Sequence, residues 1–167
     1  VKLCPEVYFI TSQQLLDLYP TLSAKEREYE ITKKYKTVFI MQIGDKLSDG
    51  QPHDLRAPDY DDWTLDGDLL FYHEVLDMAL EVSSMGIRVD KQSLLSQLEK
   101  SGKQERLQYD FHKSIVDESL PLTIGGGIGQ SRLCQLLLAR AHIGEVQASY
   151  WDKDTIQECE KLGIELL

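Results

Sequence analysis

The stretch Leu122-Thr123-Ile124-Gly125-Gly126-Gly127-Ile128-Gly129-Gln130-Ser131-Arg132-Leu133 carries four glycines directly into an arginine. We expect a buried strand over the apolar run 120–124 and a helix from Gln130 onward, where leucines recur at spacings of three and four. The glycines between them permit positive φ or a close approach of the backbone to a ligand. Arg132 then lies in the first helical turn above a glycine floor. A guanidinium there can pair with phosphate or stack on a base.

The glycine run by itself also fits a plain strand-to-helix turn, since glycine often serves only turns and packing. It lacks the Lys-Ser/Thr that ends a Walker loop, and it contains no GxGxxG at the spacing of a dinucleotide-binding motif. The two common phosphate-binding loops are therefore excluded, and a nucleotide site needs support from elsewhere in the chain.

Composition predicts one globular domain over residues 1–167, because 42% of the residues are hydrophobic. The net charge of −10 argues against nucleic acid as a partner. No apolar run is long enough for a bilayer, so no membrane is expected. Three cysteines, odd in number and far apart, suggest neither a disulfide framework nor a zinc site. Together with the lack of a leader-like start, this favours a cytoplasmic location.

The chain contains both strand-like and helix-like segments, and the strands are joined by hairpins and loops. This arrangement predicts an α+β fold with a mainly antiparallel sheet flanked by helices. A helix over 76–82 competes with the hairpin, and a polar loop is expected over 44–63. The expected strands are 6–11, 37–43, 68–72, 79–83 with an extension to 89, 120–124 and 145–150. The expected helices begin near Thr11, Ser23, Asp90, Glu105 and Gln130, and a last amphipathic helix holds Ile156 and Leu162.

An acidic cluster, Asp59-Tyr60-Asp61-Asp62, lies between Arg56 and Trp63. Runs of like charge are usually solvated surfaces. The alternative is a loop whose carboxylates receive an ammonium group while the aromatic residues pack it in place.

Two further carboxylates, Asp68 and Glu81, lie on the two strands of the expected hairpin, with Ser84 and Arg88 close behind. A hairpin could bring both to one surface, where a magnesium ion takes one or two carboxylates and completes its shell with water and substrate phosphates. Exposed strand carboxylates are the ordinary alternative.

Several segments together resemble the ammonia-dependent asparagine synthetases, also called aspartate-ammonia ligases, over nearly the whole chain. The segments that carry this resemblance are KLSDG (46–50), RAPDYDDW (56–63), GD (67–68), EVSSMGIRVD (81–90), the glycine run ending in SRL (131–133) and HIGEVQ (142–147).

The resemblance implies the catalytic fold of class II aminoacyl-tRNA synthetases, a homodimer, and the use of ATP and Mg²⁺. It further implies that the aspartate side chain is activated to aspartyl-adenylate and that ammonia then yields asparagine, AMP and pyrophosphate.

The resemblance also assigns roles by position. Arg132 resembles the motif-three arginine that contacts ATP, Asp61 a carboxylate near the substrate's amino group, and Arg88 an arginine that holds the amino acid. The implied catalytic residues are Asp61, Arg88 and Arg132. The implied substrate-binding residues are Asp61, Ser83, Arg88, Gly125 and Gly126. The implied nucleotide-binding residues are Asp68, Glu81, Ser84, Gly127 and Arg132, with Asp68 and Glu81 as the metal ligands.

The chain departs from the family pattern because it resembles only about the C-terminal half of a member. Motif one, the motif-two arginine and further aspartate-binding residues would belong to the other half, so residues 1–167 alone are expected to be inactive. Tyr72-His73-Glu74 also stands where Trp-Asn-Pro is expected, and the segment after Trp63 is short. A non-catalytic paralogue and a tRNA-charging enzyme are the competing hypotheses, although no basic RNA-binding face is apparent.

Overall fold

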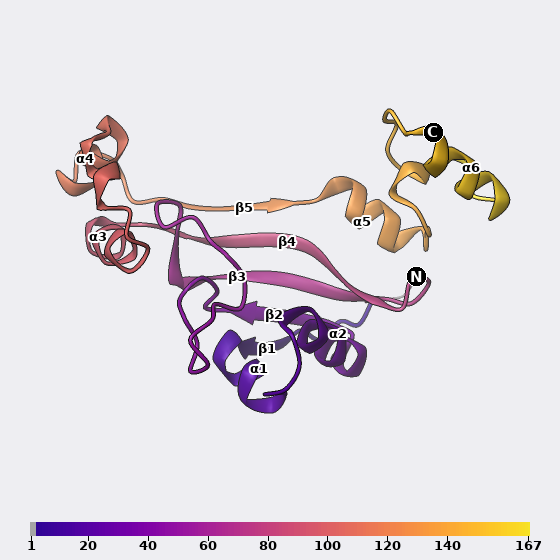
Figure 1. Cartoon of the computed structure of the whole chain (residues 1–167), viewed down its shortest axis with the longest axis horizontal. Helices are drawn as coiled ribbons and strands as arrows, with labels where there is room; N and C mark the ends of the chain where they lie inside the picture. Colours follow the sequence, from indigo (N-terminus) through magenta and orange to yellow (C-terminus); the bar gives the residue numbers. More distant parts are fainter. Residues whose placement is uncertain (1–2) are drawn as a thin grey trace.

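A computed structural model describes residues 3–167 and shows one mixed sheet with helices around it (Figure 1). Its strands, in sequence and in spatial order, are β1 (Tyr8–Thr11), β2 (Thr37–Met41), β3 (Asp61–His73), β4 (Met78–Arg88) and β5 (Ile124–Ile128). Its α-helices are α1 (Ser12–Leu18), α2 (Ala24–Tyr35), α3 (Lys91–Lys100), α4 (Asp110–Val116), α5 (Gln130–Leu137) and α6 (Lys153–Lys161). Two 3₁₀ turns, η1 (Gln104–Gln108) and η2 (Ile143–Glu145), complete the described part.

The sheet is mainly antiparallel, as the sequence predicts. Strand β1 runs parallel to β2, and every other neighbouring pair is antiparallel. The long β3–β4 hairpin occupies the centre, so the helix considered over 76–82 does not form. The connection at 74–77 is short enough for a direct hairpin between antiparallel strands.

Helices α1 and α2 cover one face of the sheet. Their sequence signals are confirmed, because Thr11 and Ser23 both close capping boxes at the helix starts. The core between these helices and the sheet contains Ile10, Leu15, Ile31, Val38, Ile40, Ile43 and Leu70. Helix α5 packs Leu133 and Leu136 on Leu80 and Val82 of β4. Side chains on a strand alternate between faces, so the two helical packings use alternate residues of the hairpin.

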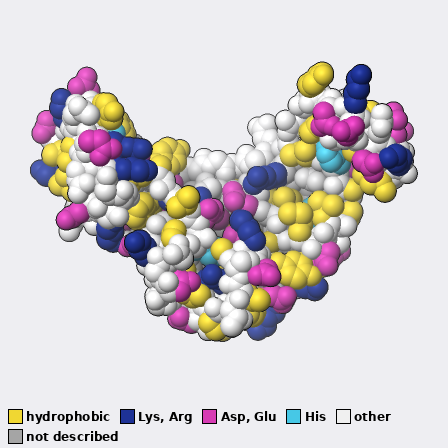
Figure 2. Space-filling model, in the orientation of Figure 1, with side chains coloured by type: hydrophobic (Ala, Val, Ile, Leu, Met, Phe, Trp, Pro, Cys, Tyr) yellow, Lys and Arg dark blue, Asp and Glu magenta, His cyan; other side chains and the backbone are white. Residues whose placement is uncertain are grey.

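Helices α3 to α6 lie toward the two ends of the sheet. Figure 1 shows α3 and α4 beyond the end of β4, and α5 and α6 beyond the end of β5. The space-filling view shows acidic and basic side chains gathered between these raised ends (Figure 2). Within residues 3–167, no helix combines the length and apolarity that crossing a membrane requires.

The prediction of a buried strand over 120–124 is wrong, because the glycines themselves form β5. Ile124 is 77% exposed, since β5 is the sheet edge and is joined to β4 through its backbone. None of Gly125, Gly126 and Gly127 has a positive φ, so these glycines do not form a turn. Glycine in an extended conformation can pair through its backbone like any other residue. Because glycine has no side chain, the pattern of apolar residues does not predict such a strand.

Three other boundaries differ from the expectation. Strand β3 begins at Asp61 and not at Asp68, so the end of the expected loop is in the sheet. The helix expected over 105–116 is divided into η1 and α4 at Tyr109. The strand expected over 145–150 does not form, and the 3₁₀ turn η2 precedes an irregular segment. Alternation alone cannot make a strand where no neighbouring strand is present to pair with it.

Candidate active site

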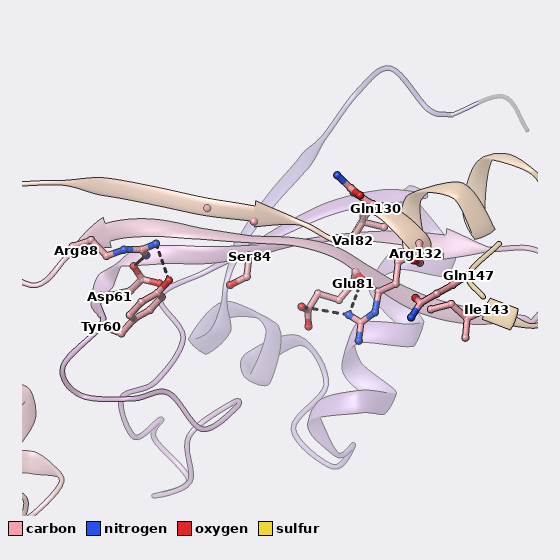
Figure 3. A pocket seen from close by; sticks show the side chains of 14 residues that line it. Tyr60, Asp61, Glu81, Val82, Ser84, Arg88, Gln130, Arg132, Ile143 and Gln147 are labelled. Carbon is pink, nitrogen blue, oxygen red and sulfur yellow. Dashed lines mark hydrogen bonds and ion pairs between the residues drawn. The ribbon is translucent and has the colours of Figure 1, made fainter. Parts of the chain in front are cut away.

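A cavity of about 600 Å³ lies over the β4–β5 side of the sheet, between Arg88 at one end and Arg132 at the other (Figure 3). Its walls come from the start of β3, from β4 and β5, from the first turn of α5 and from η2 and the segment after it. The residues that line it are Tyr60, Asp61, Glu81, Val82, Ser84, Arg88, Gly126, Gly127, Gly129, Gln130, Ser131, Arg132, Ile143 and Gln147.

The Arg132 end joins helix α5 to strand β4. Nη1 of Arg132 donates a hydrogen bond to the main-chain oxygen of Glu81 at 3.0 Å and lies 3.6 Å from its carboxylate Oε1. Burial raises the pKa of the Glu81 carboxyl, and the charge of Asp68 raises it further, while Arg132 opposes both. About half of the Arg132 side chain stays exposed, so its charge is available to a ligand in the cavity.

The Arg88 end is held more tightly. The Arg88 guanidinium forms an ion pair with Asp61, its cross-strand neighbour on β3. Nη2 of Arg88 donates to the hydroxyl of Tyr60 at 3.0 Å, and Cζ lies 4.0 Å from the centre of the Tyr60 ring. Three contacts therefore fix the orientation of this cation against the pocket wall.

The three glycines of β5 meet different surroundings. An added Cβ at Gly125 would overlap Nη2 of Arg88, and one at Gly126 would lie 2.7 Å from Cβ of Met85. A Cβ at Gly127 would have no protein atom within 4 Å, yet Gly127 lines the cavity. A side chain at 127 would thus occupy only pocket space, which supports the interpretation of this strand as a floor for a ligand.

Asp68 lies next to the pocket and is held by Arg56, an arginine whose sequence context predicts no role in the site. Asp68 pairs in register with Ser84, and its carboxylate binds the guanidinium of Arg56. Nε of Arg56 also lies 4.0 Å from Oδ2 of Asp66. Side chains alternate along β3, so Asp66 and Asp68 lie on the same face. This spacing in the sequence could have indicated that one arginine contacts both carboxylates.

Asp66 is the most perturbed carboxyl of this group. It is 6% exposed, and its Oδ1 accepts the main-chain N–H of Ile43 at 2.8 Å, while its Oδ2 has no hydrogen-bond partner. Burial raises the pKa of Asp66 to about 7, against the opposing effect of the Ile43 hydrogen bond and of Arg56. Asp66 is therefore partly protonated near neutral pH.

Asp68 and Glu81 can bind a divalent cation, but residues 3–167 alone do not supply enough side-chain ligands to complete its coordination. In the part of the chain that the structure describes, no three His, Cys, Asp or Glu side chains group as metal ligands. Oδ1 of Asp68 is buried without a partner within the protein, and the charge of Asp68 raises the pKa of Glu81, as expected for two carboxylates that lie close together. These residues fit a magnesium ion that takes its other ligands from water and phosphate.

The remaining predicted residues lie apart from the cavity or at its edge. Ser83 lines a groove on the opposite face together with Met85, because neighbouring strand residues alternate, and its hydroxyl is buried without a partner. Gly125 lies under Arg88 and not in the cavity wall.

The acidic cluster is divided by the fold and is not a single solvated loop. Of its three carboxylates, only that of Asp61 lines the cavity, beside Tyr60. Asp59 accepts hydrogen bonds from Arg106 at 2.8 Å and from His112 at 2.9 Å, and Asp62 accepts the N–H of Thr64 at 2.8 Å.

The fold is that of the class II aminoacyl-tRNA synthetases. The chain superposes on Entamoeba histolytica asparaginyl-tRNA synthetase in complex with asparaginyl-adenylate with a TM-score of 0.59, at 17% identity, over 87% of this chain and 34% of that one. For Entamoeba histolytica aspartyl-tRNA synthetase the TM-score is 0.58, at 16% identity, over 90% and 32%. At these identities the likeness concerns the fold alone.

The sequence narrows this class to one family. A sequence model of the family described as aspartate-ammonia ligase matches residues 1–163, and the chain belongs to that family. It is 57% identical to the aspartate-ammonia ligase of Ruminiclostridium cellulolyticum over 99% of this chain and 50% of the relative. It is 58% identical to that of Ligilactobacillus salivarius over 97% and 48%. The chain thus spans about half the length of the curated relatives it matches.

Proposed function

We propose that this chain carries one half of the active site of an enzyme that makes L-asparagine from L-aspartate, ammonia and ATP. The observation that carries the proposal is a single cavity with the Arg88–Asp61 pair at one end and the Arg132–Glu81 pair at the other, over a glycine strand. One end suits an amino acid and the other a nucleotide. Family membership supports the named substrates.

At the amino-acid end, Arg88 and Asp61 offer one charge of each sign. The α-carboxylate and α-ammonium of aspartate are a matching pair, so the substrate can replace the contact that the two side chains make with each other. Tyr60 stacks on the guanidinium and keeps its plane oriented toward the cavity. The Entamoeba histolytica asparaginyl-tRNA synthetase, which shares this fold, was solved with asparaginyl-adenylate, and this supports the assignment by fold-level analogy.

At the nucleotide end, Arg132 faces the charge that develops when an oxygen of the substrate side-chain carboxylate attacks the α-phosphorus of ATP. That bond forms as the bond to pyrophosphate breaks, leaving aspartyl-adenylate. A fixed donor at such a centre is commonly worth about 3–4 kcal/mol. A magnesium ion near Asp68 and Glu81, when bound, would supply positive charge to the phosphates.

In the second step, the nitrogen lone pair of ammonia attacks the carbonyl carbon of the adenylate, and AMP leaves. The nitrogen loses one proton as the amide of asparagine forms. Ammonium must give up a proton before it can attack, and Asp61 is one cavity carboxylate that can hold ammonium or accept that proton.

The proposal is tested with a full-length protein that contains this sequence and has the length of the curated relatives. We expect aspartate, ¹⁵N-ammonium and MgATP to yield ¹⁵N-amide asparagine together with equal amounts of AMP and pyrophosphate, measured by mass spectrometry and chromatography. Formation of ADP and phosphate would contradict the adenylate route. Absence of asparagine with intact ATP binding would favour a non-catalytic paralogue.

Residues 1–167 alone are expected to make no asparagine, because half of the site is then missing. We also propose that the full-length protein is a homodimer, which sedimentation equilibrium measures directly. Robust synthesis by the 167-residue piece would contradict the half-site account.

A further inference from the structure

The side-chain amide of Gln97 on α3 binds the segment that leads into the amino-acid end of the cavity. Gln97 is 4% exposed. Its Oε1 accepts the main-chain N–H of Trp63 at 2.9 Å, and its Nε2 donates to the main-chain oxygens of Pro58 and Asp61, each at 3.0 Å. One side chain thus binds backbone groups on both sides of Asp61, more than thirty positions away in the sequence.

These bonds fall beside an irregularity of the β3–β4 pairing, next to the backbone hydrogen bond of 3.0 Å from Val89 N–H to the main-chain oxygen of Tyr60. Asp61 is in register with Arg88, but the next pair is Asp66 with Gly86, and the register is irregular between them. Backbone groups of the intervening residues need partners from outside the β3–β4 ladder when they are buried. Gln97 supplies a partner to Trp63 and thereby holds the start of β3 where Asp61 meets Arg88.

A second attachment joins the same helical segment to the same loop. Asp59 accepts hydrogen bonds from Arg106 in η1 and from His112 in α4. The stretch 58–63 is therefore bound to the segment from α3 to α4 on both sides of Tyr60 and Asp61. Neither Gln97 nor Asp59 lines the cavity, so neither touches a ligand there.

We propose that Gln97 is a positioning residue that sets aspartate recognition by holding Asp61, and through it Arg88, in place. This inference rests on the proposed function. The nucleotide end is built from β4, β5 and α5, and Gln97 makes none of its hydrogen bonds there. Loosening the start of β3 should therefore weaken the amino-acid end and spare the Arg132 end.

The test compares Gln97→Met, which keeps the side-chain length without the three hydrogen bonds, with Leu94→Ala as a matched control. Leu94 is fully buried on the same helix and packs on Val89 and Leu98, so its truncation loosens the helix without removing any of the three hydrogen bonds that Gln97 makes to the 58–63 stretch. Both variants are made in the full-length protein. We expect Gln97→Met to raise the aspartate KM about tenfold with the ATP KM changed less than about twofold. Leu94→Ala should lower the melting temperature without this split.

A second variant and a second measurement keep the test decisive if Gln97→Met folds poorly. Asp59→Asn weakens the other attachment and should shift the aspartate KM in the same direction. Arginine side-chain NMR of the ligand-free protein should show Arg88 Nε resonances moving in both variants while those of Arg132 stay in place.

The two hypotheses fail separately. Equal changes in both KM values, or an aspartate effect of the same size in Leu94→Ala, would overturn the positioning role. If the wild-type protein makes no asparagine, the proposed function fails, and the NMR comparison still decides whether Gln97 holds Arg88.

Discussion

Arg88 occupies the space that a side chain at position 125 would need, because an added Cβ on Gly125 would overlap its Nη2. The guanidinium cannot retreat easily, since Asp61 and Tyr60 hold it from the other side. The glycine at 125 is thus required by a neighbouring protein side chain, whereas Gly127 has open pocket space before it. Two glycines of one short strand therefore serve different purposes.

Gly125→Ala should displace Arg88 and weaken aspartate binding, because the methyl group competes with the guanidinium for the same space. We expect the aspartate KM of the full-length protein to rise by about tenfold or more, corresponding to at least about 1.4 kcal/mol. Steady-state kinetics with aspartate varied at saturating MgATP measure the change.

Gly127→Ala is the matched variant on the same strand. It meets no protein atom, so the melting temperature should hold while the ATP KM rises. An unchanged aspartate KM in Gly125→Ala would show that Arg88 relocates without consequence, and the amino-acid assignment of that end would then be wrong.

Arg132→Ala should leave the fold intact, because Leu133 and Leu136 already pack the apolar face of α5. We expect aspartate-dependent ATP–pyrophosphate exchange to fall roughly a hundredfold, or about 3 kcal/mol, from the loss of a charged group at the reacting phosphate. Arg132→Lys should recover little, since an ammonium cannot reproduce a planar fork. Wild-type exchange in Arg132→Ala, or loss of exchange through unfolding alone, would make Arg132 a structural residue.

Arg56→Gln should destabilise the protein strongly. Arg56 pairs with buried Asp68 and lies near buried Asp66, and removing one partner of a buried pair typically costs about 3–5 kcal/mol. Urea unfolding at pH 8 measures the loss. Lys100→Ala, which breaks an exposed pair with Asp45, is the control and should cost at most about 1 kcal/mol.

Asp66 should make stability fall as the pH rises from about 4 to about 7. Its pKa is about 7 in the folded chain and 3.8 in the reference state, so the folded state binds a proton that the unfolded state has lost in this range. The stabilisation is complete below the lower value and gone above the upper one. Asp66→Asn keeps an oxygen for the N–H of Ile43 and cannot ionise.

The free energy of unfolding of Asp66→Asn should therefore improve relative to wild type by on the order of 2–4 kcal/mol between pH 4 and pH 8. Urea titrations of both proteins at pH 4, 6 and 8 give the difference at each pH. A difference that does not vary with pH would mean that Asp66 ionises normally in the folded chain.

Much of the fold was predictable because its signals are local. The capping boxes at Thr11 and Ser23, the central hairpin and helix α5 all follow from short spacings of polar and apolar residues. Strand β5 was misplaced because its order comes from β4 and not from its own residues. The division of the acidic cluster and the Arg56–Asp68 pair were missed for the same reason, since each depends on partners distant in the chain.

The sequence by itself determined the family, the α+β class and a run of glycines followed by an arginine at the start of a helix, because these are properties of motifs and short-range periodicity. Only the tertiary structure decided that Gly125 makes room for Arg88, that Ser84 and not Ser83 faces the cavity, and that Gln97 holds the start of β3. The physical reason is that strand register and side-chain contacts between distant segments are set when the sheet pairs and its core packs. Which charges become partners, and which stay buried without one, is settled only at that point.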